Sequence, residues 1–516
     1  MSDKQTQEKE HLKDLAAKPF LPRSLGYIKM TGPGLLQSAM TLGAGSAAAS
    51  VVAGASFGYK LLWVQPLAMF FGVMMFAAVS NIVLSKSTER PYWSFMREMK
   101  SIWSPLVLLV FLWGFCTIMS SMIWHFPQYG LAAGAARSMV QQFAPDSPMT
   151  TGKKIEQRLF YGAGPVIPNE KGEPALVDEY TPLGLQVSAA TGVIILFLNI
   201  IVVFNYGRGG IGIKIYEWFL RCMIALVFLT FLLVVILNCN KIDWLEMGKG
   251  FIGWYGVPYS PDPAEYAKTW TTVLGMLGAA VGINMTFLYP YSLLKKGWGE
   301  EHKQLAKWDL GMSMFLPFCV VTSLMMIGMT VSGVYDGRDV VNSVIDPIAA
   351  AAALHSGGFL SKEMATVIFC GGLLGMTAGA VSTHMTCCGF TWCEMLGLKQ
   401  STWAFRLFAL TPCIGVFGVI VPLPFWFPVA ASAVCLTMLP VAYLIFLILS
   451  NKRGYLGTAV GKGFRHWVFN IILILALTAA TIGACIQVKS RVIDKLFPAE
   501  PAAVQTESET NPAAEK

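Results

Sequence analysis

Two short stretches of the chain carry residue types from which a buried binding site for a small solute can be built. The first reads TLGAGSAAAS from Thr41 to Ser50, and the second reads GAAVGINMTF from Gly278 to Phe287. Both lie inside long apolar runs and contain glycine, which weakens a helix by about 1 kcal/mol relative to alanine. A broken helix leaves backbone N–H and C=O groups without intrahelical partners, so these groups can face a ligand.

The predicted binding residues at the two breaks are small and neutral. They are Gly43, Gly45 and Ser46 in the first stretch, and Ala279, Gly282 and Asn284 in the second. Ser46 and Asn284 carry side-chain oxygen and are therefore the tentative metal ligands. No Asp, Glu, Lys or Arg occurs at 33–56 or 271–294. A dehydrated divalent cation usually needs a carboxylate, so this set favours a largely hydrated ion such as Mg²⁺, bound weakly, over Mn²⁺ or Fe²⁺.

A neutral or anionic organic solute, such as an amino acid, is the alternative for the same site. Exposed backbone N–H groups and the positive end of a half-helix suit a carboxylate better than a bare cation. Phe287, Tyr289 and Trp124 would then line an apolar pocket. The residues leave both kinds of solute open.

Three titratable side chains are candidates for coupling or gating. His125 and His384 lie well inside apolar segments, and Asp309 opens another one. Ionisable residues within a membrane are functional by default, and histidine can transfer protons near neutral pH. A structural histidine and a packing pair are the open alternatives for these positions.

The run HMTCCGFTWC is the one place where metal-binding side chains gather. On a helix His384 and Cys388 share a face, whereas Cys387 points away. No second ligand pair appears elsewhere in the sequence. We therefore expect no enzyme activity and no cofactor.

The composition defines the elements that must position these residues. The chain has 516 residues, of which 55% are hydrophobic and 13% charged, and its mean hydropathy is +0.56. These values indicate an all-α polytopic protein embedded in the lipid bilayer. The net charge of +8 comes without any basic run interleaved with aromatic residues, so no nucleic-acid partner is expected. The oligomeric state is not specified by the sequence.

Apolar segments predict about eleven transmembrane helices. They run at 33–56, 60–84, 105–131, 184–204, 213–238, 271–294, 309–334, 362–388, 403–423, 427–450 and 466–487. Lys and Arg concentrate in alternate loops, as expected for a cytoplasmic N-terminus. We therefore predict a multi-pass protein of the plasma or inner membrane.

Matching breaks in the first and sixth spans indicate two five-span halves of opposite orientation, which is a 5+5 inverted repeat typical of transporters. The predicted domains are a cytoplasmic segment at 1–32, a membrane domain at 33–487 and a disordered tail at 488–516. Within the membrane domain the first repeat covers 33–238, the second covers 271–450, and an extra helix covers 466–487.

The order and spacing of several segments resemble the Nramp family of divalent-metal transporters. They are GPGLLQSAMTLGAGSAAASVVAGASFGYKLLWV, GMLGAAVGINMTFLYPYSLL, Asp309, GGLLGMTAGAVSTHMTCCGFTWCEMLG and LTMLPVAYLIFLILSNKRGYLG. The resemblance runs from Gly32 to about Gly457. It implies the leucine-transporter fold, with a solute held midway across the membrane, and a secondary transporter that moves a divalent cation by alternating access.

The chain departs from the family at the residues that would bind metal. Where the family has Asp-Pro-Gly-Asn in the first span, this chain has Gly43, Ala44, Gly45 and Ser46. Where the family has Met-Pro-His in the sixth span, it has Gly282, Ile283 and Asn284. The family's acidic residues of the third span align with Thr117 and Trp124. The resemblance thus favours a metal, the site chemistry favours an organic solute, and a non-transporting sensor is a third possibility.

Overall fold

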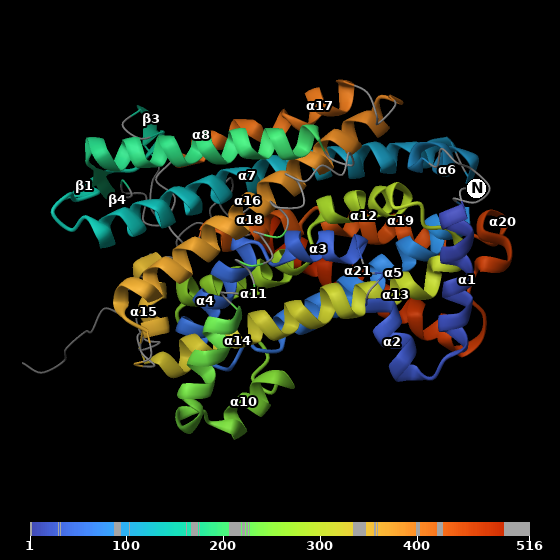
Figure 1. Ribbon diagram of the computed structural model, residues 1–516, viewed down its shortest axis with the longest axis horizontal. Coiled ribbons are helices and arrows are strands. Elements are labelled where there is room, and N and C mark those ends of the chain that lie inside the picture. The colour runs from blue at the N-terminus through green and yellow to red at the C-terminus, as the bar shows by residue number, and fades with distance from the viewer. Residues whose placement is uncertain are drawn as a thin grey trace, which may run out of the picture.

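The long helices of the protein run side by side along one direction (Figure 1). The computed structural model describes residues 3–28, 30, 32–86, 94–102, 104–160, 163–166, 174, 176–205, 218, 222, 225, 228–333, 347–355, 358, 360–398, 403–420 and 427–489. The predicted tail at 488–516 lies almost wholly outside these residues.

The helices long enough to cross a membrane agree with the predicted spans. Within the described residues, 8 helical segments qualify by length and hydropathy: Val64–Lys86, Val107–Phe143, Pro182–Phe204, Glu265–Lys295, Glu300–Ser332, Lys362–Met395, Phe427–Asn451 and Gly463–Val488. Three shorter apolar helices are Gly45–Phe57, Phe228–Leu237 and Trp403–Val419. Each of the predicted spans has a counterpart in these two sets, so the all-α polytopic fold is confirmed.

The individual elements have the following bounds. The helices of the first half are α1 (Asp3–Ala17), α2 (Phe20–Ile28), α3 (Pro33–Thr41), α4 (Ala44–Phe57), α5 (Val64–Lys86), α6 (Phe95–Ile102), α7 (Val107–Phe143) and α8 (Pro182–Phe204). Those of the second half are α10 (Trp244–Phe251), α11 (Pro263–Ala280), α12 (Ile283–Lys295), α13 (Lys303–Asp309), the π-helix η4 (Leu310–Phe315), α14 (Leu316–Ser332), α15 (Pro347–His355), α16 (Lys362–Met395), α17 (Trp403–Ala409), the 3₁₀-helix η5 (Thr411–Val419), α18 (Phe427–Leu436), α19 (Leu439–Asn451), α20 (Arg453–Leu456) and α21 (Gly463–Val488).

Two small antiparallel ribbons interrupt the helical pattern between α7 and α8. Strand β1 (Thr150–Glu156) pairs with β4 (Leu176–Tyr180), and β2 (Arg158–Phe160) pairs with β3 (Ala163–Val166). They lie beside the start of α8, at the end of the bundle opposite α1 (Figure 1).

Both predicted breaks are present, and they have the same local form. The first span is divided into α3 and α4, and the sixth into α11 and α12. Gly43 precedes α4 with φ −79° and ψ 177°, and Gly282 precedes α12 with φ −89° and ψ 154°. One extended glycine therefore ends the helical path in each span and starts the second half-helix.

Two other residues in the sixth span, Gly278 and Pro290, are of types that can interrupt a helix but do not do so here. Gly278 lies within α11, where a Cβ would come 2.3 Å from the carbonyl oxygen of Ser432 on α18. Its role is therefore close helix packing, which small residues permit in membrane proteins. Pro290 lies inside a continuous α12. The break in this span occurs at Gly282.

The N-terminal segment, expected only to be polar, forms two helices that pack on the bundle. Trp308 of α13 contacts the rings of Phe20 and Tyr27, with centroids 5.3 and 6.3 Å apart. The hydroxyl of Tyr27 donates to Gln304 over 3.4 Å. The segment before the first span is thereby attached to the connection between the sixth and seventh.

Candidate functional site

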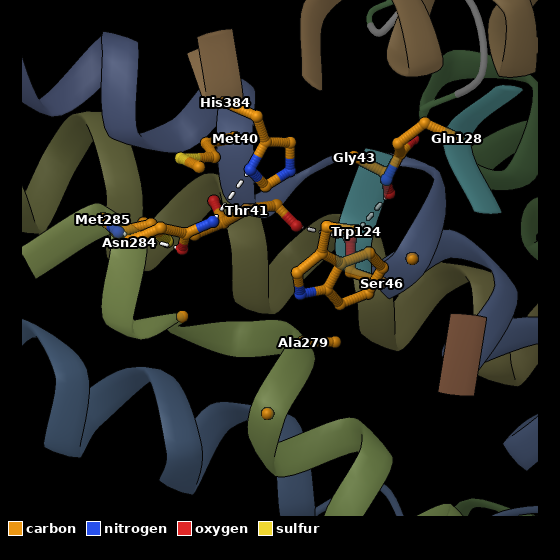
Figure 2. Close-up of a pocket in the computed structure, with 13 residues that line it drawn as sticks. Met40, Thr41, Gly43, Ser46, Trp124, Gln128, Ala279, Asn284, Met285 and His384 are labelled. Atoms are coloured by element: carbon orange, nitrogen blue, oxygen red, sulfur yellow. Dashed lines mark hydrogen bonds between the residues drawn. The ribbon is translucent and has the colours of Figure 1, made fainter. Parts of the chain in front are cut away.

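The two breaks enclose one small cavity deep in the helical bundle. Its volume is about 30 Å³, room for about two water molecules. It is lined by Met40, Thr41, Gly43, Gly45, Ser46, Trp124, Gln128, Gly278, Ala279, Gly282, Asn284, Met285 and His384. All six residues of the predicted binding set therefore lie around one space (Figure 2), and their binding role stays a prediction.

At the first break, the hydroxyl of Ser46 bridges the gap between the half-helices. Its Oγ donates to the carbonyl oxygen of Thr41 over 2.5 Å and to that of Gly43 over 3.0 Å. The Thr41 carbonyl would otherwise lack an intrahelical partner at the end of α3, whereas the Gly43 carbonyl also accepts from the Ala47 N–H over 3.2 Å. Ser46 is buried, and its proton is committed to the backbone. Only its oxygen lone pairs are available to a ligand in this state.

Trp124 of α7 closes the cavity by packing onto the backbone of the first break. A Cβ on Gly45 would lie 2.3 Å from the ring carbon Cη2 of Trp124. Any side chain at this position therefore displaces the indole ring. Gly43 has more room, because its nearest neighbour would be the Met40 carbonyl oxygen at 3.1 Å. Gly45 thus allows the Trp124 ring to approach the backbone closely, whereas Gly43 is the extended residue that forms the break.

At the second break, Asn284 connects α12 to α16. Its Oδ1 accepts from the Met285 N–H over 2.9 Å, and its Nδ2 lies 2.8 Å from Nδ1 of His384 (Figure 2). Its main-chain oxygen accepts from Sγ of Cys387 over 3.0 Å. Because Oδ1 faces a backbone donor, the amide NH₂ donates to the imidazole. Nδ1 of His384 is then the acceptor, and the neutral ring carries its proton on Nε2.

The two histidines lie together, but only one reaches the cavity. His384 is part of the lining, whereas His125 is not. Their rings pack edge to face with centroids 5.6 Å apart. Nε2 of His125 lies 3.2 Å from the carbonyl oxygen of Val381, one helical turn before His384 on α16. The pair links α7 to α16 directly behind the cavity.

Asp309 lies away from the cavity, at the far end of α3. Its buried carboxylate accepts from the N–H of Gly34 over 2.6 Å and from that of Gly32 over 3.2 Å. These donors form the positive end of α3, where a carboxylate is stabilising. Of the three coupling and gating candidates, His384 therefore lines the cavity, His125 packs against His384, and Asp309 lies at a helix end.

Three lining residues were not among those expected from the sequence: Met40, Gln128 and Met285. Two signals point to them in retrospect. Met40 directly precedes Thr41, and Gln128 lies one helical turn after Trp124, on the same face of α7. Oε1 of Gln128 is buried and has no hydrogen-bond partner among the described residues, so it is a free acceptor at the site.

The aromatic pocket expected for an organic solute is not formed. Of its three residues, Trp124 alone lines the cavity. Phe287 packs on Trp113 with ring centroids 4.5 Å apart, and Tyr289 packs on Phe76 at 5.1 Å. Both rings belong to the core between α12 and its neighbours, because Phe287 faces α7 and Tyr289 faces α5.

The site has no formal charge of its own. Among the described residues, the lining contains no Asp, Glu, Lys or Arg, and no group of three His, Cys, Asp or Glu side chains is placed to hold a metal ion. His384 and Cys388 accordingly lack a third ligand. The N-terminal ends of α4 and α12 and the C-terminal ends of α3 and α11 meet at the breaks, so helix dipoles of both signs converge there.

Known structures share this architecture. Two crystal structures of a manganese transporter from Eremococcus coleocola superpose with TM-scores of 0.63, at 18% and 16% identity, each covering 94% of this chain and 90% and 91% of that chain. MhsT in complex with L-phenylalanine superposes with a TM-score of 0.51 at 12% identity, covering 87% of this chain and 98% of that one. At these identities the likeness is one of fold.

The fold and the paired breaks define an integral membrane protein of the leucine-transporter fold. The sequence profile of the natural resistance-associated macrophage protein-like family, Nramp, matches residues 182–486. The chain therefore belongs to the Nramp family. The match begins at α8, so the first break lies outside it. No curated protein matches the sequence.

Proposed function

We propose that this protein is a secondary transporter that carries a divalent metal cation by alternating access, with the cavity between the breaks as its binding site. Membership of the Nramp family supports this proposal, as does the shared fold of a protein described as a manganese transporter. The observation that carries it is one small cavity lined by residues of both broken spans.

The size of the cavity favours a small ion over an organic solute. Pockets for organic ligands usually measure about 300–1,000 Å³, whereas this one holds about 30 Å³. An ion that keeps one or two of its waters fits the closed state. A fully hydrated ion, or an amino acid, requires the helices to separate first.

The ligands available to the ion are neutral. They are the oxygens of Ser46, Gln128 and Thr41, the amide of Asn284, and backbone carbonyls at the breaks. Mg²⁺ accepts such hard oxygens together with its own waters. The thioethers of Met40 and Met285 also line the cavity, and soft ligands favour transition metals. With no carboxylate, binding is weak for either ion, and we propose Mg²⁺ as the main substrate.

The ends of the broken helices supply the moving parts of the proposed cycle. The Asp309 carboxylate holds the first turn of α3 against α13, and opening this end requires those hydrogen bonds to break. At the cavity, the Asn284–His384 contact ties α12 to α16. We assign Asp309 a gating role, and His384 with His125 a role in proton coupling, because histidine changes charge near neutral pH.

The test is uptake of Mg²⁺ and Mn²⁺ into proteoliposomes that contain the purified protein, at several external pH values. Saturable Mg²⁺ uptake with little preference for Mn²⁺ supports the proposed site. Ser46→Leu and Asn284→Leu fill the cavity and are expected to abolish uptake while the protein still inserts. Wild-type flux in both variants would exclude this cavity as the site.

An organic anion remains the second candidate because of one observation. The positive N-terminal ends of α4 and α12 face a cavity that contains no carboxylate, an arrangement suited to an anionic group. If neither ion is transported by correctly inserted protein, uptake of a labelled amino-acid mixture discriminates between this alternative and a non-transporting sensor.

A further inference from the structure

Two short helices expose their apolar faces instead of burying them. One is α2, which ends at Ile28, just before α3 begins at Pro33. The other is α10, which ends at Phe251 and is followed by α11 from Pro263. Each helix therefore leads into one of the two broken spans. They occupy equivalent positions in the inverted repeat.

The polar side of α2 faces the protein and its apolar side faces away. Leu21 and Leu25, one turn apart, are 68% and 56% exposed. Tyr27 on the other side is buried and bonds to Gln304. In a water-soluble protein the apolar face of a surface helix is turned to the core. Here the arrangement is the reverse.

Helix α10 shows the same reversal with a larger apolar surface. Its exposed residues share one face because they are spaced at i, i+1, i+4, i+7 and i+8: Trp244, Leu245, Gly248, Phe251 and Ile252. Leu245 and Ile252 are 69% and 75% exposed. Trp254, just after the helix, is 71% exposed. Tryptophan is enriched where a protein meets the headgroup region of a membrane.

The opposite face of α10 is polar or packed closely on the protein. A Cβ on Gly250 would lie 2.1 Å from the carbonyl oxygen of Tyr59, so the backbones are in contact there. Glu246 pairs with Lys249 at 2.8 Å and accepts from the hydroxyl of Tyr255. These hydrogen bonds lower the pKa of the Glu246 carboxyl, so the pair stays ionised at neutral pH.

The charges near α2 are more basic than those near α10. Lys13, Lys18 and Arg23 lie on or beside α2, together with one acidic residue, Asp14. Around α10, the cations Lys60, Lys241 and Lys249 lie near two carboxylates, Asp243 and Glu246. Cytoplasmic leaflets are rich in anionic lipid, which attracts clustered Lys and Arg.

The positions of both helices suit contact with lipid. Five spans separate the start of α3 from the start of α11, so α2 and α10 belong to opposite membrane surfaces. Both project from the same lower edge of the bundle, α2 toward the end that carries α1 and α10 nearer the end that carries α15 (Figure 1).

We propose that α2 and α10 bind the lipid bilayer as interfacial helices, α2 among the anionic headgroups of the cytoplasmic leaflet and α10 in the headgroup region of the opposite leaflet. Amphipathic helices of this kind lie in the plane of the interface with their apolar face in the acyl boundary. The occupant of both exposed faces is thus phospholipid.

Through this proposed lipid binding, both ends of the first broken span are connected to helices that contact the bilayer. Helix α2 connects to α3 through residues 29–32. Helix α10 packs on the loop that follows α4, where Trp63 Nε1 donates to the carbonyl oxygen of Gly256 over 3.2 Å. Any effect on flux rests on the proposed transport function, whereas lipid binding does not.

Photocrosslinking of the full-length protein in vesicles tests lipid binding directly. The photoreactive residue p-benzoylphenylalanine replaces Leu25 or Leu245, with Lys153 on β1 as the exposed control. In vesicles of phosphatidylcholine and phosphatidylglycerol, both leucine positions are expected to yield phospholipid adducts by mass spectrometry, and the control none. An equal adduct yield at the control, or none at either leucine, would overturn the proposal.

The lipid composition of the vesicles distinguishes the binding of α2 from that of α10. Removal of phosphatidylglycerol is expected to lower the adduct yield at position 25 several-fold and to leave that at position 245 unchanged. An unchanged yield at position 25 would overturn the assignment of α2 to anionic headgroups.

A double variant, Leu21→Gln with Leu25→Gln, tests the functional consequence. Because both side chains are exposed, we expect unchanged melting in detergent and several-fold slower uptake in vesicles. Full uptake in this variant would show that lipid contact at α2 does not control α3. Absence of uptake in the wild type would refute the transport proposal and leave the crosslinking result valid.

Discussion

The breaks in the first and sixth spans have the same backbone conformation, but different hydrogen-bond partners stabilise them. In each, an extended glycine precedes the second half-helix. The hydrogen bonds at the first break stay within its own segment, because Ser46 donates back to the carbonyls of Thr41 and Gly43. Those at the second break involve another helix, because Asn284 bonds to His384 and Cys387 of α16.

This difference indicates which break can move as a unit. The hydrogen bonds that bridge α3 and α4 travel with them, so rotation of the first span leaves Ser46 satisfied. Movement of α12 relative to α16 instead leaves buried polar groups unpaired, which costs about 1–3 kcal/mol for each group. We therefore expect the first span to move more readily than the sixth, which is bonded to α16 at the cavity.

The largest effect is expected at Gly45, where the first break contacts α7. Gly45→Ala places a methyl group 2.3 Å from the Trp124 ring, and the ring must move into the cavity. Overpacking costs about 1–3 kcal/mol, so we expect uptake to fall about tenfold or more. Gly371→Ala on α16 is the matched control, since nothing lies within 4 Å of its Cβ.

A second variant connects this loss to the indole ring. Trp124→Phe in the Gly45→Ala background provides space and is expected to restore part of the uptake. If Gly45→Ala transports normally by itself, the ring does not form the wall of the site.

The attachment of the second break is tested at Asn284. Asn284→Ala removes the donor to His384 and one acceptor of the Met285 N–H, which keeps its bond to the Gly282 carbonyl, and we expect a stability loss of about 1–3 kcal/mol. Asn284→Asp keeps the acceptor but buries an uncompensated carboxylate, so its loss should be at least as large. Thermal unfolding in one detergent compares them. Equal stability of the alanine variant and the wild type would mean that the His384 contact contributes nothing.

The internal closure of the first break is tested at Ser46. Ser46→Ala removes a neutral hydrogen bond worth about 0.5–1.5 kcal/mol, and Gly43 keeps its bond from the Ala47 N–H. We therefore expect a smaller stability loss than for Asn284→Ala, and recovery in Ser46→Thr, which retains the hydroxyl. A loss that exceeds that of Asn284→Ala would reverse the ranking of the two breaks.

The smallest effect on downhill flux is expected at His125, behind the second break. His125→Ala should abolish accumulation of the ion driven by a pH gradient and leave exchange down the ion's own gradient intact. Both are measured in the same proteoliposomes. Accumulation that persists against a gradient would make the histidine pair a structural contact between α7 and α16.

The spans and the breaks were predictable from the sequence because they depend on local composition. Apolar runs must cross the bilayer as helices, since no other open structure satisfies the backbone there. Glycines at Gly43 and Gly282 marked where the helices stop. The lack of charge at the site was equally visible, because it is a property of the segments themselves.

The role of each glycine was not predictable from the same pattern. Gly278 and Gly282 lie four residues apart in the same span, yet one packs against Ser432 and the other ends the helix. The difference arises from α18, which packs closely at Gly278 and not at Gly282. A sequence motif does not contain the position of a neighbouring helix.

By itself, therefore, the sequence determined the apolar spans, the two helix breaks and the lack of charge around them. The tertiary structure decided which side chains close that site. Trp124 packs on Gly45, His384 binds Asn284 and Asp309 caps α3 across separations of tens to hundreds of residues. Such pairs depend on how distant helices pack, and helix packing is fixed by shape and space in the folded bundle rather than by the periodicity of any one segment.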